Sequence, residues 1–160
     1  MTCIAAIRTD KGVWMAADRQ TTRGWDRDAH SVAKIGRVGP ALVGCSGDAR
    51  QAQLVRHCVE APAPLDGGDV MRWMIVDFAA AVRQALTEAG QVKTKDGVES
   101  VEMDMLVAVE GRIFHVTSSL GVVENPIGYA ACGSGEDFAL GALYATAKLD
   151  LAPEYRLRLA

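Results

Sequence analysis

The sequence predicts an α+β fold in which two stacked, mainly antiparallel sheets are covered by helices. Short apolar runs of strand length come in two blocks, and residues with helical spacing follow each block. Separate blocks of strands and helices indicate an α+β fold rather than alternating βαβ units. Several strand-like runs are apolar at nearly every position, which indicates burial on both faces.

The first block predicts two hairpins. Residues 3–8 and 13–17 are apolar runs around a short polar turn that contains a glycine. Residues 34–38 and 41–45 flank a Gly–Pro pair, which is a turn signal. Residues 24–31, between the two hairpins, are polar and are expected to form a loop.

A helix pair follows the first block. Apolar residues from Ala52 to Val59 have helical spacing, and two prolines after them end that helix. Asp69 is a suitable N-cap for the next helix. Its apolar stripe runs over residues 70–89, with Gly90 at the C-cap position.

The pattern then returns to strands and ends in helix. The strands are expected over residues 103–109, 113–117, 120–123 and 127–132. A helix is expected from residue 136 to about residue 147, and a further helical start at 153–160.

Length and composition are those of one globular domain over residues 1–160. The hydrophobic fraction is 49% and the charged fraction 23%. The net charge of −3 comes without a cluster of Lys and Arg, which argues against a nucleic-acid partner. No apolar stretch approaches the roughly 20 residues that cross a bilayer, and the first residues do not resemble a signal peptide. We expect a cytoplasmic protein without a membrane partner.

Metal binding is not expected. The four cysteines form no CxxC pair, and no histidine lies at metal-ligand spacing from them. The sequence therefore predicts no metal and no cofactor.

Three polar residues lie at the ends of predicted apolar strands, where their side chains stand out. Thr2 follows the initiator Met1, Asp18 closes an apolar strand, and Lys34 opens another. Taken singly, each has a structural interpretation: a β-forming residue, a turn residue and a solvated edge charge.

Together with their surroundings, these residues resemble a known family. The run Thr2–Ile7, followed by Trp14–Gln20, is similar to the start of mature proteasome β subunits and of the HslV peptidase. In those proteins a threonine nucleophile begins the chain, an aspartate ends the second strand and a lysine opens the third. Asp18 and Lys34 follow Thr2 by sixteen and thirty-two residues, as in the family. The Gly-rich turns at residues 44–49 and 133–135, each leading into a helix, also resemble family turns.

The resemblance implies a threonine peptidase. Thr2 would be the nucleophile, and its α-amine, freed by removal of Met1, would be the base. Lys34 would favour the neutral amine and stabilise the developing alkoxide, and Asp18 would hold that lysine. The backbone N–H of Gly47 would stabilise the oxyanion.

Other positions matching the family are implied to support the nucleophile or bind substrate. Ser134 matches the serine that hydrogen-bonds near the amine of the nucleophile. The backbone of Thr22 would pair with an extended substrate. The specificity pocket would involve small, mostly uncharged residues, which favour an apolar side chain before the cleaved bond: Thr21, Val32, Cys45 and Ala49.

The family also implies an architecture and an assembly. The fold would be the four-layer αββα sandwich of N-terminal nucleophile hydrolases. Family members continue beyond the point where this sequence ends, so we expect the last helix and the closing strands to be missing. The chain would form a homo-oligomeric ring, hexameric or heptameric, single or stacked. Unfolded polypeptides would be cleaved in its chamber, with an ATP-dependent unfoldase as partner.

Two alternative functions remain open from the sequence. The chain could be a catalytically silent structural subunit that keeps the fold and the ring contacts. It could also be an amidase that uses the same nucleophile on small amides.

Overall fold

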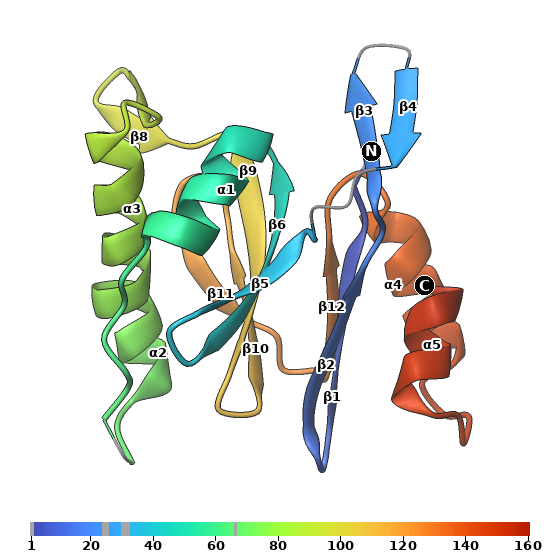
Figure 1. Cartoon of the computed structure of the whole chain (residues 1–160). Coiled ribbons are helices and arrows are strands. Elements are labelled where there is room, and N and C mark those ends of the chain that lie inside the picture. The colour runs from blue at the N-terminus through green and yellow to red at the C-terminus, as the bar shows by residue number, and fades with distance from the viewer. Residues whose placement is uncertain (1, 24–25, 30–32, 66) are drawn as a thin grey trace.

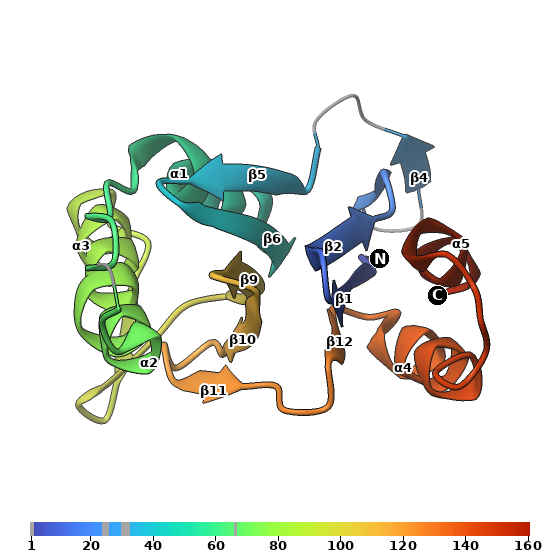
Figure 2. The same ribbon diagram turned by 90° about the horizontal axis from the view of Figure 1, so that it is seen from below.

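Two sheets packed face to face form the centre of the molecule, and helices cover the outer face of each (Figure 1). The computed structural model describes residues 2–23, 26–29, 33–65 and 67–160, and of 21–23 and 26–29 it describes the backbone. Figure 2 shows the four layers side by side. The expected αββα sandwich is therefore confirmed.

The first sheet has the strand order β12–β1–β2, and both pairs are antiparallel. Its strands are β1 (Ile4–Thr9), β2 (Gly12–Ala17) and β12 (Tyr129–Cys132). Ile4 and Ala6 of the central strand pack in the layer between the two sheets. Ala5 and Ile7 pack against the helices on the other face. This two-sided burial is the reason why β1 is apolar at consecutive positions.

The second sheet has the strand order β11–β10–β9–β6–β5, again with antiparallel pairs. Its strands are β5 (Ile35–Val38), β6 (Ala41–Gly47), β9 (Met103–Val109), β10 (Arg112–Val116) and β11 (Val122–Glu124). Gly44 on β6 lies where the two sheets approach each other closely. A Cβ there would come within 2.7 Å of Ile4 and 3.1 Å of Met15, so a side chain at this position would push the sheets apart.

Among the residues that the structure describes, two helical stretches cover the second sheet and two helices cover the first. They are α1 (Ala49–Cys58), α2 (Val70–Trp73) continued by the π-helical turn η1 (Met74–Phe78) and α3 (Ala79–Glu88), then α4 (Glu136–Ala145) and α5 (Pro153–Leu159). Asp69 caps the α2 N-terminus by accepting hydrogen bonds from the N–H groups of Met71 and Arg72, as its position in the sequence predicted. No helix of the described residues is long and apolar enough to cross a membrane.

Two short polar hairpins were not predicted from the sequence. Residues 24–31 were expected to be a loop, but β3 (Gln20–Arg23) pairs with β4 (Asp26–Ala29) in a hairpin that projects from the sandwich (Figure 1). The loop prediction is wrong for 26–29. A second hairpin joins β7 (Lys93–Lys95) to β8 (Val98–Ser100). Both lack the apolar alternation that marks a half-buried strand.

Candidate active site

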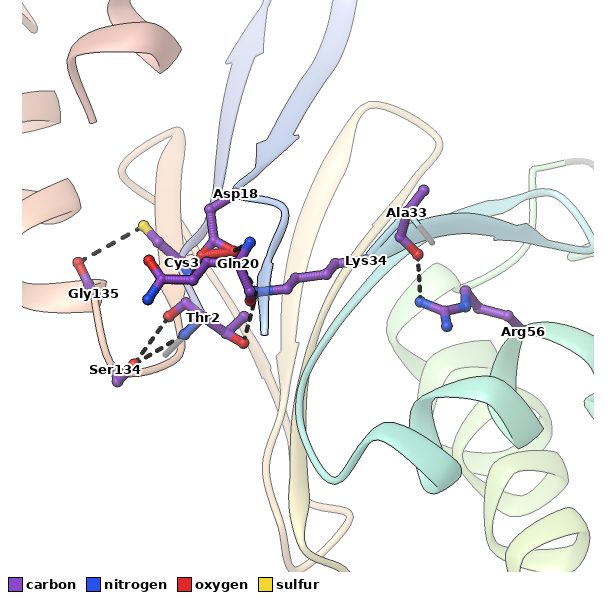
Figure 3. A network of polar contacts seen from close by, with 9 residues as sticks. All are labelled: Thr2, Cys3, Asp18, Gln20, Ala33, Lys34, Arg56, Ser134 and Gly135. Atoms are coloured by element: carbon purple, nitrogen blue, oxygen red, sulfur yellow. Dashed lines mark hydrogen bonds and ion pairs between the residues drawn. The ribbon is translucent and has the colours of Figure 1, made fainter. Parts of the chain in front are cut away.

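Thr2 and Lys34 meet at the end of the sandwich where β1 and β5 begin (Figure 3). The Lys34 Nζ atom donates a hydrogen bond of 3.0 Å to Thr2 Oγ1 and another of 2.6 Å to the carbonyl oxygen of Gln20. It also forms an ion pair with Asp18. Only 14% of the Lys34 side chain is exposed, so this ammonium group is held in place and largely shielded from water.

Asp18 is fixed by main-chain hydrogen bonds. Its Oδ2 atom accepts from the N–H of Cys3 at 2.8 Å, and its Oδ1 atom accepts from the N–H of Gln20 at 3.1 Å. The N–H of Asp18 donates to the carbonyl of Cys3 at 3.1 Å. These bonds extend the β1–β2 pairing by one residue beyond β2. They place the carboxylate beside Thr2 and the Lys34 ammonium group.

The turn between β12 and α4 holds the backbone of Thr2. The Thr2 nitrogen donates to Ser134 Oγ at 3.0 Å, and the N–H of Gly135 donates to the carbonyl of Thr2 at 3.0 Å. Gly133 has a φ of +96°, and a Cβ there would lie 2.5 Å from the Thr2 carbonyl oxygen. The turn therefore requires glycine both for its conformation and for its closeness to Thr2.

Gly47 ends β6 with its N–H directed toward the Lys34 side of the strand. The N–H of Cys45 donates to the carbonyl of Lys34 at 3.1 Å, whereas that of Asp48 donates to Glu102 at 2.8 Å on the opposite side. N–H directions alternate along a strand, so the N–H of Gly47 points to the same side as that of Cys45. Gly47 is exposed and has a φ of +108°.

The expected substrate-binding residues are distributed over three elements. Thr21 and Thr22 lie in the part of β3 of which the backbone alone is described, and Val32 lies outside the described residues, as does Met1. Ala49 is exposed at the start of α1, but Cys45 is only 3% exposed and belongs to the core under the helices. Burial raises the pKa of the Cys45 thiol to about 12.

The family assignment follows from comparison with known proteins. A family profile described as "Proteasome subunit" matches residues 1–160. This chain belongs to the proteasome subunit family. The resemblance inferred from Thr2, Asp18 and Lys34 is thereby confirmed, and it places the chain among peptidases of the N-terminal nucleophile type.

Several solved structures share the fold of this family member. BPH from Thiobacillus denitrificans, in complex with epoxomicin, is 31% identical with a TM-score of 0.79, covering 98% of this chain and 86% of that one. The eukaryotic HslV from Trypanosoma brucei is 22% identical with a TM-score of 0.67 and the same coverage. Anbu from Yersinia bercovieri is 15% identical with a TM-score of 0.63, covering 99% of this chain and 71% of that one.

Sequence reasoning pointed to the turn at residues 133–135 as similar to a family turn, but it did not predict how the residues around Thr2 and Lys34 support them. Gln20 contributes its carbonyl to Lys34, and Gly133 and Gly135 accommodate the Thr2 backbone. Cys3, next to Thr2, has its thiol 3.8 Å from the carbonyl oxygen of Gly135. Burial, with a smaller effect of Asp18, raises the pKa of this thiol. The glycine pair around Ser134 was the available signal, since a close approach of two backbones requires residues without side chains.

Proposed function

We propose that this chain is a threonine peptidase with Thr2 as its nucleophile. The observation that supports it is the 3.0 Å contact between Lys34 Nζ and Thr2 Oγ1, with Asp18 bound to the same ammonium group. An ammonium group beside a hydroxyl stabilises the alkoxide that forms as the proton leaves. A lysine that only paired with Asp18 on the surface would need no contact with this hydroxyl.

The base in this proposal is the α-amine of Thr2. Removal of Met1 converts the Thr2 nitrogen into a free amine, and an α-amine with a pKa of roughly 8 can accept a proton near neutral pH. Ser134 Oγ already lies 3.0 Å from this nitrogen. The serine would therefore orient the amine toward the Thr2 hydroxyl.

The reaction is an acyl transfer in two steps. Thr2 Oγ1 attacks the carbonyl carbon of the cleaved peptide bond, and its proton passes to the α-amine. The C–N bond then breaks, the protonated α-amine passes its proton to the leaving amine, and an ester remains on Thr2. Water, deprotonated by the same amine, attacks the ester carbonyl. The C–O bond to Thr2 Oγ1 then breaks, the new carboxyl end of the peptide leaves, and the proton returns from the amine to Oγ1. The N–H of Gly47 would stabilise the oxyanion in both steps.

The substrate is proposed to be an unfolded polypeptide cleaved inside a ring of identical subunits. An extended peptide can pair with the backbone at Thr22 on β3, as in other strand additions. Thr21, Val32, Cys45 and Ala49 are proposed to surround the side chain before the cut. Three parts of the proposal rest on the family alone: the hexameric or heptameric ring, its ATP-dependent unfoldase and a cytoplasmic location.

Intact mass spectrometry with a peptide epoxyketone tests this function. The epoxyketone reacts with a threonine hydroxyl and the free amine of the same residue, so we expect a protein that lacks Met1 and gains one adduct. Thr2→Ala should gain none, and it should lose peptide hydrolysis while keeping its oligomeric state. A parent protein that keeps Met1 and gains no adduct would favour a silent structural subunit. Labelling without peptide hydrolysis, but with turnover of simple amides, would favour an amidase.

A further inference from the structure

Lys34 lies at the start of an edge strand. Among the described strands, β5 pairs with β6 alone. The carbonyl of Lys34 accepts a hydrogen bond of 3.1 Å from the N–H of Cys45 on β6. Carbonyl directions alternate along a strand, so the carbonyl of Ala33, one residue earlier, points to the free edge of β5. An edge carbonyl finds its donor in a side chain or in water.

Arg56 of α1 supplies that donor. Its Nη1 atom donates to the carbonyl of Ala33 at 2.7 Å, and Figure 3 shows this contact directly before Lys34. The arginine stem crosses β5 at Gly36, where a Cβ would lie 2.9 Å from Cδ and 3.2 Å from Cγ of Arg56. The φ of Gly36 is not positive, so glycine at this position provides space rather than conformational freedom. Gly36 and Arg56 together therefore let α1 reach the free edge of β5.

The ammonium group of Lys34 depends on where this strand begins. Its Nζ atom donates to Thr2 Oγ1 at 3.0 Å and to the carbonyl of Gln20 at 2.6 Å, and it pairs with Asp18. All three partners lie outside the second sheet, in the segment that forms the β1–β2 hairpin and the start of β3. A shift of the β5 end relative to that hairpin would therefore weaken these contacts together.

We infer that Arg56 is a positioning residue for catalysis: by holding the Ala33 carbonyl, it keeps Lys34 where its ammonium group meets the Thr2 hydroxyl. The inference rests on the proposed function, in which Lys34 assists the nucleophile. Arg56 itself contacts neither the substrate nor the reacting atoms. Misplacement of a catalytic group by about 1 Å can cost about 10²-fold in rate, so the anchoring of this strand end is enough to affect the chemistry.

Arg56→Met tests this role, because methionine keeps an unbranched apolar stem but has no N–H donor. Loss of the hydrogen bond should lower kcat/KM for a fluorogenic peptide about tenfold. Arg56→Lys keeps a donor and should recover part of the rate. An ammonium group beside the α-amine of Thr2 favours the neutral form of that amine. A displaced Lys34 should therefore move the acid limb of the pH profile of kcat/KM to higher pH, which a smaller fraction of folded enzyme would not do.

A double-mutant comparison shows whether Arg56 acts through Lys34. The rate of epoxyketone labelling of Thr2 is measured in the parent, in Arg56→Met, in Lys34→Ala and in the protein with both changes. If the arginine positions the lysine, Arg56→Met should slow labelling in the parent but leave it almost unchanged once Lys34 is alanine. An equal loss in both backgrounds would show that Arg56 supports the fold alone, and it would overturn the inference.

Arg37→Met is the matched control. Arg37 is exposed on β5 and follows Gly36, so its side chain projects to the opposite face. This variant should keep the rate, the acid limb and the labelling of the parent. A parent-level rate in Arg56→Met, or a loss of rate without a shift of the acid limb, would contradict the inference and leave the proposed function intact. A parent that neither cleaves the peptide nor gains an epoxyketone adduct would remove the proposed function and the inference with it.

Discussion

Lys34 Nζ lies 3.0 Å from Thr2 Oγ1, although 32 positions separate the two residues in the chain. Thr2 precedes β1 of the first sheet and Lys34 precedes β5 of the second. The contact therefore bridges the two sheets of the sandwich. It can form only because the sheets pack face to face with these strand ends at the same edge.

Replacement of Lys34 by alanine should reduce peptide hydrolysis by about 10²- to 10⁴-fold, the range typical of a group that assists proton transfer. The variant keeps the Thr2 hydroxyl but loses the ammonium group that contacts it. Steady-state kinetics with a fluorogenic peptide measure the effect. Lys11→Ala, in the exposed β1–β2 turn, is the control and should retain full activity. Parent-level activity of Lys34→Ala would contradict the proposed role.

Ser134→Ala should slow acylation without unfolding the site. It removes a neutral hydrogen bond to the Thr2 nitrogen, which is worth about 1 kcal/mol, or roughly fivefold in rate. The rate of epoxyketone labelling measures acylation directly. Ser134→Thr retains the hydroxyl and should stay close to the parent rate. If both variants label at the same reduced rate, the hydroxyl is not what orients the amine.

Gly133→Ala should lower the free energy of unfolding by about 1 to 3 kcal/mol, the range for strained backbone conformations. The new Cβ would also come within 2.5 Å of the Thr2 carbonyl oxygen, so labelling of Thr2 should fall. Gly111→Ala separates the two causes. Gly111 has a φ of +72° with nothing within 4 Å of a Cβ, so it should show the conformational cost alone. Urea unfolding of both variants makes the comparison, and equal losses would argue against the close contact with Thr2.

The buried thiols should make the protein less stable at alkaline pH. Burial raises the pKa of Cys45 and of Cys132 from 9.0 to about 12. Between these values the unfolded chain releases thiol protons that the folded chain retains. The folded state then binds more protons, so its stability falls as pH rises above 9.0.

Urea unfolding at neutral and alkaline pH measures this decline. For each protein the free energy of unfolding at alkaline pH is compared with its value at neutral pH. The difference should be smaller for Cys45→Ala than for the parent, because this variant lacks one of the thiols whose pKa is raised. Cys58→Ala changes an exposed thiol and should leave the decline as in the parent. An equal decline in all three proteins would show that the Cys45 thiol does not carry the effect.

Most helices and strands could be predicted from the sequence, because burial of one or both faces gives their apolar residues a regular spacing. The hairpin of β1 and β2, the helix stripe over residues 70–89 and the N-cap at Asp69 follow from local patterns. The β3–β4 hairpin could not be predicted in the same way, because its strands are polar and project from the sandwich.

The sequence by itself determined the class of the fold, the family and the three residues on which the proposed chemistry depends. Periodicity and the spacing of Thr2, Asp18 and Lys34 are local properties that folding does not change. Only the tertiary structure decided that these residues form one hydrogen-bonded network. The physical reason is that the network joins strand ends from two different sheets. Their distance depends on how the sheets stack, which no single stretch of sequence encodes.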